Sequence, residues 1–164
     1  MPELVVDLEE LKKRSEENHS AFGEFAKKVK EIPVTQFDEL AHPIVADITS
    51  QIDCTQCGNC CRHQEPGVDA EEIERLAKKK NMTAENFKND FVAWNKEGVS
   101  FLFQKPCTFL SENICSIYSD RPHSCADFPG LHRPRLKWRM KQVEENYSIC
   151  PIVFNVVERL KEVI

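Results

Sequence analysis

Apolar residues recur every three or four positions through much of the chain, and this spacing predicts a mainly helical protein. Over the first part of the sequence the pattern predicts one long helix or two, with apolar positions at Leu4, Leu8, Leu11, Phe22, Phe25, Val29 and Ile32. We expect this face to pack on the rest of the protein, with a coiled-coil partner site as the alternative. Pro33 ends the segment, and Thr35 with Asp38 predicts the start of another helix that Pro43 shortens or kinks.

Three more helices are predicted further along the chain. Asp69 and Glu72 form a capping-box-like pair that opens a helix over residues 70–80. Thr83 caps another helix, which ends before Gly98 and carries the predicted core residues Phe87, Phe91 and Trp94. The last helix begins at Pro151, a residue suited to the first helical position, and its apolar face holds Ile152, Val156, Leu160 and Val163.

Short β-prone runs interrupt the helical pattern. The runs at 99–103 and 115–118 predict a small hairpin around a turn at 111–113. Asp120 followed by Pro122 predicts the cap and first turn of a short helix. Residues 136–141 alternate apolar and basic side chains, which predicts a half-buried strand. We expect its basic face to be solvated, with a contact to the acidic N-terminal third as one option, and an anionic-ligand groove is the alternative.

These elements together predict a mainly α fold with a small β-hairpin, an α+β domain stapled by metal. We expect a single compact domain with an N-terminal helical extension. In this division residues 1–49 form a helical segment packed on the core, and residues 50–164 form a cysteine-cluster metal-binding domain.

Composition narrows the class of protein. With 164 residues, 41% of them hydrophobic, the chain can bury a core of its own. Acidic residues outnumber basic ones by 27 to 22, so the net charge is −5, which argues against broad binding of nucleic acid or of a membrane surface. The charged N-terminus lacks an apolar signal-peptide region, and we therefore expect a cytoplasmic protein with reduced thiols. The oligomeric state is left open.

The five glycines are widely separated, which excludes the familiar glycine-rich loops. Neither a dinucleotide loop nor a phosphate loop nor a nucleophile elbow can be written around them. No pair of carboxylates and no Ser, His and Asp set stands at an interpretable spacing. The catalytic residues, if the protein is an enzyme, are therefore unknown from the sequence.

The candidate chemistry lies in the eight cysteines. Four of them form a C-x2-C-x2-C-C run, namely Cys54, Cys57, Cys60 and Cys61. Gly58 can take a positive φ, so the first pair can form a turn that aims both sulfurs at one metal. The other four follow at wide spacing: Cys107, Cys115, Cys125 and Cys150.

Several ligand sets are compatible with this spacing. Consecutive side chains generally diverge, so one of Cys60 and Cys61 is expected to face elsewhere. That residue would complete a second set of four thiols, whose other members are Cys107, Cys115 and Cys125. Cys150, which precedes a proline as remote iron–sulfur ligands often do, is paired with the first set as a guess. The alternatives are two four-thiolate sites, one site plus a redox-active group, or one polynuclear centre.

The spacing favours an iron–sulfur cluster, of the 4Fe–4S type, over zinc. Structural zinc usually uses two C-x2-C knuckles, and only the first half of that pattern is present. C-x2-C-x2-C is part of the bacterial iron–sulfur pattern. Zinc remains the alternative, and either metal could serve only to hold loops together.

The cysteine pattern resembles the YkgJ-type CxxCxxCC cysteine-cluster family, a domain described as zinc- or iron-chelating. The resemblance covers about residues 50–152 and includes the segments that begin at Cys107, Cys115 and Cys125. Ala126 stands where the family often has an arginine, and no proline directly follows Cys107. The resemblance implies metal chelation by the cysteines. A related branch, the flagellin lysine N-methylases, is thought to use an iron–sulfur centre.

Two functions compete at this point. The first is a cytoplasmic iron–sulfur protein that takes part in redox chemistry or in a methyl-transfer-like modification of a protein lysine. The second is a non-catalytic zinc module that mediates protein–protein interaction. Both include a possible protein partner or substrate, and whether the protein is an enzyme is left uncertain.

Overall fold

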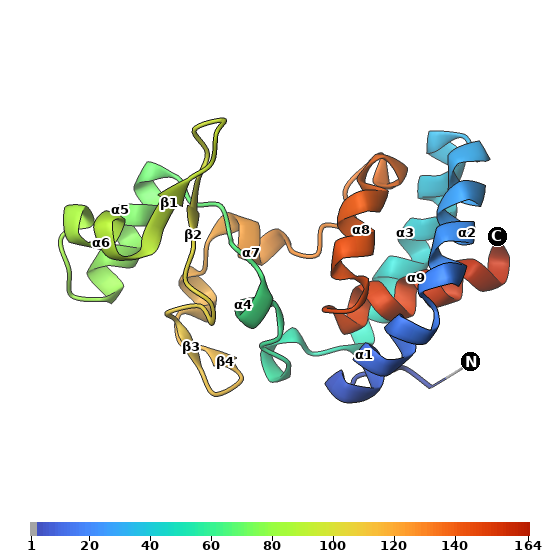
Figure 1. Cartoon of the computed structure of the whole chain (residues 1–164), viewed down its shortest axis with the longest axis horizontal. Helices are drawn as coiled ribbons and strands as arrows, with labels where there is room; N and C mark the ends of the chain where they lie inside the picture. Colours follow the sequence, from blue (N-terminus) through green and yellow to red (C-terminus); the bar gives the residue numbers. More distant parts are fainter. Residues whose placement is uncertain (1–2) are drawn as a thin grey trace. The chain divides into compact units, whose positions relative to one another are not determined.

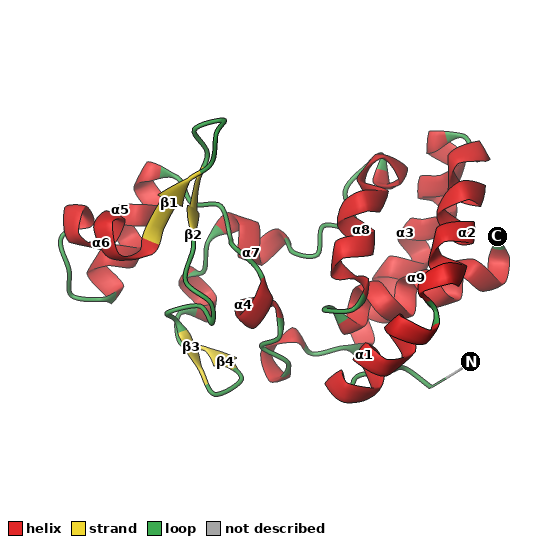
Figure 2. Cartoon of the chain, in the orientation of Figure 1, coloured by secondary structure: helices red, strands yellow, loops and turns green. Residues whose placement is uncertain are grey.

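Helices build most of the structure, as the apolar spacing predicts. The computed structural model describes residues 3–164, in which the helices are joined by two short antiparallel strand pairs (Figures 1 and 2). The predicted fold class, mainly α with a small β-hairpin, is confirmed. Two compact units are present: a helical unit made of the chain up to Asp53 and of Pro129–Ile164, and a cysteine-rich unit made of Cys54–Phe128. The predicted division at residues 1–49 and 50–164 stays a prediction, and its first two residues lie outside the described ones.

The first predicted helical segment is two helices, α1 (Leu8–Glu17) and α2 (His19–Glu31). They separate at Asn18, whose backbone leaves the helical region while its N–H bonds back to the carbonyl of Arg14. Pro33 then precedes α3 (Val34–Gln51), so the predicted cap at Thr35 is wrong. Pro43 lies inside α3 and does not end it.

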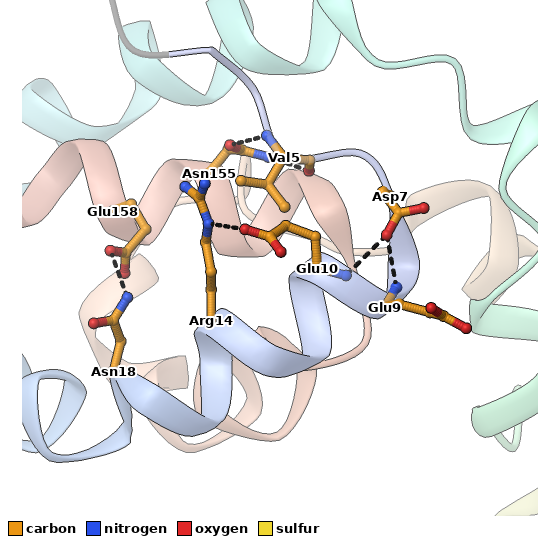
Figure 3. Close-up of polar contacts among 8 residues, drawn as sticks. All are labelled: Val5, Asp7, Glu9, Glu10, Arg14, Asn18, Asn155 and Glu158. Carbon is orange, nitrogen blue, oxygen red and sulfur yellow. Dashed lines mark hydrogen bonds and ion pairs between the residues drawn. The ribbon is translucent and has the colours of Figure 1, made fainter.

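The start of the chain is fixed to the last helix, α9 (Pro151–Val163), as Figure 3 shows. Asn155 on α9 accepts a hydrogen bond from the N–H of Val5 (2.9 Å) and donates one to its carbonyl oxygen (2.8 Å). Asp7 then caps α1 by accepting from the N–H groups of Glu9 and Glu10. The two bonds at Val5 satisfy buried backbone groups, and those of Asp7 satisfy free N–H groups at the start of the helix.

Helix α9 is the centre of the helical unit. Its start at Pro151 is confirmed, and Ile152, Val156 and Leu160 are buried as predicted. Val163, predicted on the same apolar face, is instead 55% exposed because it lies at the end of the helix. The first two turns are buried on all sides by α3, α1 and α8 (Met140–Tyr147).

Residues 136–141 are helical, and the predicted strand there is wrong. They form a 3-10 helix, η3 (Leu136–Arg139), that leads into α8. A carboxylate from α3 caps this turn, since Asp38 accepts hydrogen bonds from the N–H groups of Arg135 and Leu136. In this tight turn Leu136 is 2% exposed and Trp138 is 70% exposed, so the apolar residues of the alternating pattern do not share one buried face as they would in a strand.

In the cysteine-rich unit the helix caps predicted at Asp69 and Thr83 are confirmed. Helix α5 (Ala70–Lys79) begins at the capping box of Asp69 and Glu72, and α6 (Ala84–Phe91) begins at Thr83. Helix α6 ends earlier than predicted, because β1 (Val92–Trp94) pairs with β2 (Ser100–Leu102) in antiparallel register. Trp94 is consequently 54% exposed, and its predicted place in the core is wrong.

The predicted turn at 111–113 is confirmed. It joins β3 (Leu110–Ser111) to β4 (Ile114–Cys115), whereas the run at 99–103 pairs with β1 and takes no part in this hairpin. Asp120 does not cap the next helix, because it closes a 3-10 turn, η2 (Tyr118–Asp120), and pairs with Lys79. Helix α7 (His123–Asp127) starts after Pro122 instead. None of the helices described over residues 3–164 is long and apolar enough to span a membrane.

Candidate metal centre

The first cysteine pair lies on a tight turn followed by a short helix. A 3-10 turn, η1 (Cys54–Gln56), precedes Gly58, and α4 (Cys60–His63) carries the Cys60–Cys61 doublet. Gly58 has a φ of +60°, so its predicted positive φ is confirmed. A Cβ at this position would lie 2.5 Å from the carbonyl oxygen of Asn113. Glycine is therefore required twice, by the backbone conformation and by the close approach of the β3–β4 turn.

Arg62 fastens these two segments to each other. Its guanidinium donates to the carbonyl of Gly58 (3.1 Å), to the carbonyl of Glu112 (2.7 Å) and to the side-chain oxygen of Asn113 (2.7 Å). The fixed fork of an arginine can hold several acceptors at once. The cysteine turn and the β3–β4 turn are thus held as one piece.

Among the downstream cysteines, Cys107 joins this piece through a backbone hydrogen bond. The N–H of Cys107 donates to the carbonyl of Cys61 over 2.7 Å. Two further backbone amides point at sulfur: that of Phe109 at Cys107, and that of Ile117 at Cys115. Each bond partly opposes the rise in pKa that burial causes at its cysteine, because an N–H donor stabilises the thiolate. Thiolates held in this way are suited to metal ligation.

Cys125 is brought to the site by α7. The N–H of His123, at the start of α7, donates to the carboxylate of Glu72 over 2.6 Å. The same buried carboxylate accepts from the N–H of Asp69 at the start of α5. Glu72 therefore fixes both helix starts, and it sets where Cys125 lies.

Four thiols gather in the cysteine-rich unit and act on one another electrostatically: Cys61, Cys107, Cys115 and Cys125. Burial and the charges of the other three raise the pKa of Cys125 to about 12. Burial is also the main cause that raises the pKa of Cys107 and of Cys115. The pKa of Cys61 is raised first by its hydrogen bond with Cys60 and then by burial. Without a metal these thiols keep their protons at neutral pH.

The other cysteines occupy different places. Cys57 and Cys60 are half-buried in the η1–α4 segment, and Cys54 is exposed. Cys150 is buried in the helical unit, at the residue before α9. Its pairing with the first cysteine group stays a prediction. The two histidines that lie next to cysteines in the sequence, His63 near Cys61 and His123 near Cys125, are exposed.

The donor set fits zinc or iron by its chemistry, since both metals bind thiolates in sets of four. As the side chains stand within residues 3–164, no group of three or more Cys, His, Asp or Glu residues is placed to hold one metal ion. Binding would therefore require the four thiols to release protons and draw together. The main-chain bonds at Cys61 and Cys107 already hold the two parts of the site next to each other.

Sequence reasoning missed the residues that support the thiols. Arg62 directly follows the doublet and could have been considered on that ground. Lys80 could not, because it lies far from any cysteine in sequence. Its ammonium donates to the carbonyl of Thr108 over 2.9 Å and opposes the rise in the pKa of Cys107 that burial causes.

Comparison with known proteins identifies a family. A family model, CxxCxxCC, with the description "Putative zinc- or iron-chelating domain", matches residues 53–151, which is more than half of the chain. Neither the curated proteins nor the solved structures give a match to this chain.

Proposed function

The chain belongs to the CxxCxxCC family, and on that premise we propose that it is a metal-binding protein with a centre on Cys61, Cys107, Cys115 and Cys125. The observation that carries the proposal is the placement of these four cysteines in one compact unit, where Cys61 raises the pKa of the other three thiols and all three of those partners raise the pKa of Cys125. Two of them also accept backbone N–H groups, which is how proteins stabilise metal-bound sulfur.

We propose an iron–sulfur cluster, with 4Fe–4S as the first expectation, as the occupant. The four gathered cysteines contain no C-x2-C knuckle of the kind that structural zinc sites usually use in pairs. The remaining Cys54, Cys57 and Cys60 keep the C-x2-C-x2-C spacing of bacterial iron–sulfur ligation and form a second candidate ligand set. Zinc is the alternative occupant for the four-thiol centre.

An iron–sulfur centre supplies electron transfer, so the proposed role is redox chemistry in a reducing compartment such as the cytoplasm. A methyl-transfer-like modification of a protein lysine is a narrower form of this role. With zinc, the metal would hold loops in place, and the protein would act by binding a protein partner.

The test is to measure iron, zinc and acid-labile sulfide per chain on protein purified without oxygen. The doublet offers a matched pair of variants. Cys61→Ser removes a member of the four-thiol set, and this variant should lose the bound metal. Cys60→Ser should retain the metal at that centre. Iron with matching sulfide supports the cluster, and zinc without sulfide favours the structural module. If Cys61→Ser binds metal as the natural chain does, the proposed ligand set is wrong.

A further inference from the structure

Three cations each act on one member of the four-thiol set, and each donates to at least one backbone carbonyl. Lys80 follows α5, and its ammonium lies 2.9 Å from the carbonyl of Thr108, next to Cys107. The same ammonium stands over two aromatic rings, 5.2 Å from the centroid of Phe109 and 5.6 Å from that of Phe91. Hydrogen bond and rings together hold this charge in one place.

Arg121 is fixed in a similar way, and its charge acts on the thiol of Cys115. Its guanidinium carbon lies 3.8 Å from the centroid of the Tyr118 ring, and its Nη1 donates to the carbonyl of Tyr118 over 2.5 Å. Arg62, the third cation, is held by the three acceptors at Gly58, Glu112 and Asn113.

These cations differ from others in the same unit. Lys79 pairs with Asp120 at 2.9 Å, and Lys105 pairs with Glu65 at 2.8 Å. Among the described residues no carboxylate lies within ion-pair distance of Lys80, Arg62 or Arg121. Each acts instead on a thiol: Lys80 on Cys107, Arg121 on Cys115, and Arg62 on Cys61.

A metal centre with four thiolates supplies the missing negative charge. Four thiolates leave two net negative charges whether they bind a zinc ion or an oxidised 4Fe–4S core. Half-buried charge of this kind is costly unless opposite charge lies nearby. Resting on the proposed function, we propose that Lys80, Arg62 and Arg121 form a cationic frame that neutralises the metal–thiolate centre and stabilises its more negatively charged state.

The same electrostatic attraction between the cationic frame and the centre affects both metal affinity and reduction potential. Removing one cation weakens the attraction that holds the thiolates in their charged form, so metal affinity falls. Reduction adds one more negative charge to an iron centre, so the same removal also lowers the reduction potential.

Lys80 offers the sharpest test. Lys80→Met keeps an aliphatic side chain against Phe91 and Phe109 but loses the charge. Zinc affinity, measured by competition with a chromophoric chelator, should fall about tenfold or more, as it does when groups around metal ligands are removed. Lys78→Met is the matched control, because it removes the same charge from an exposed position on α5 and should leave affinity unchanged. Lys80→Arg should restore most of the affinity.

Salt separates a charge effect from a packing effect. The difference in zinc affinity between the natural chain and Lys80→Met should become smaller as ionic strength rises, because added ions screen the attraction that the variant lacks. For protein that carries iron, Lys80→Met should have the lower reduction potential. If the natural chain binds metal but Lys80→Met has the same affinity and the same potential, the cationic frame is wrong while the proposed function stands. If Lys80→Arg binds as weakly as Lys80→Met, the effect is not one of charge, and the frame is likewise overturned. If the natural chain binds no metal, the proposed function itself fails.

Discussion

The backbone N–H of Cys107 lies 2.7 Å from the carbonyl oxygen of Cys61, to which it donates a hydrogen bond. This bond joins the cysteine-rich turn to the segment that carries the downstream cysteines. It brings together two members of the four-thiol set that are far apart in sequence. It also makes the backbone, and not only the side chains, part of the proposed centre.

Metal binding should therefore protect specific amides from hydrogen exchange. The N–H groups of Cys107, Phe109 and Ile117 bond to Cys61 or to a cysteine sulfur. Closing the thiolates on a metal strengthens these bonds and suppresses local opening. Exchange measured by NMR should slow at these three amides when metal is added and return to its former rate when a chelator removes the metal. Exchange at the amide of Leu11, in the core of the helical unit, is the comparison; equal slowing there would contradict a local effect.

Gly58→Ala should destabilise the cysteine-rich unit. The added Cβ meets the carbonyl of Asn113 at 2.5 Å, in a residue whose φ is +60°. We expect a loss of about 3 kcal/mol or more in the free energy of unfolding, together with weaker metal binding. Gly98→Ala is the control, since Gly98 also has a positive φ but nothing within 4 Å of its Cβ position. It should cost roughly 1–2 kcal/mol. Equal costs in denaturant unfolding would show that the contact with Asn113 is unimportant.

Glu72→Ala should affect both the stability of α5 and the position of Cys125. Its buried carboxylate accepts hydrogen bonds from the N–H groups of Asp69 and His123, and removing it leaves both donors without a partner. We expect a loss of about 1–3 kcal/mol in the free energy of unfolding. Glu74→Ala changes an exposed carboxylate on the same helix and should cost less than about 0.5 kcal/mol. Equal losses in the two variants would contradict the role given to Glu72.

Tyr147 should make the protein less stable in alkali. Burial, and then the hydrogen bond with Glu158, raise the pKa of Tyr147 in the folded state. In the unfolded chain a tyrosine loses its proton near pH about 10. Above that pH deprotonation of the tyrosine stabilises the unfolded state but not the folded state. The free energy of unfolding therefore falls by up to about 1.4 kcal/mol per pH unit.

Tyr147→Phe removes this titration and isolates its contribution. The difference in unfolding free energy between the natural chain and Tyr147→Phe should be constant from pH 7 to about pH 9.5 and should shrink above about pH 10. Both chains keep every other titrating group, and the groups that lose a partner at the Tyr147 hydroxyl are Glu158 and Lys161. A difference that stays constant through pH about 11 would show that its folded pKa is not raised.

The sequence by itself determined the features that depend on local spacing and on side-chain chemistry. It predicted the helical class, the capping box at Asp69 and Glu72, the start of α9 at Pro151, the turn at 111–113 and the positive φ of Gly58. It also pointed to cysteine as the candidate metal ligand. Each of these follows from bonds or steric limits within a few residues, which a sequence shows directly.

Only the tertiary structure decided the features that depend on partners distant in sequence. Residues 136–141 have the alternation of a strand, yet the carboxylate of Asp38 caps them as a helical turn. Trp94 continues a helical spacing, yet pairing with β2 turns that segment into a strand. The gathering of Cys61 with Cys107, Cys115 and Cys125, and the placement of Lys80 beside them, likewise depends on long-range packing. A local pattern cannot specify which distant group will satisfy a backbone donor or approach a thiol, because that choice is made when the core assembles.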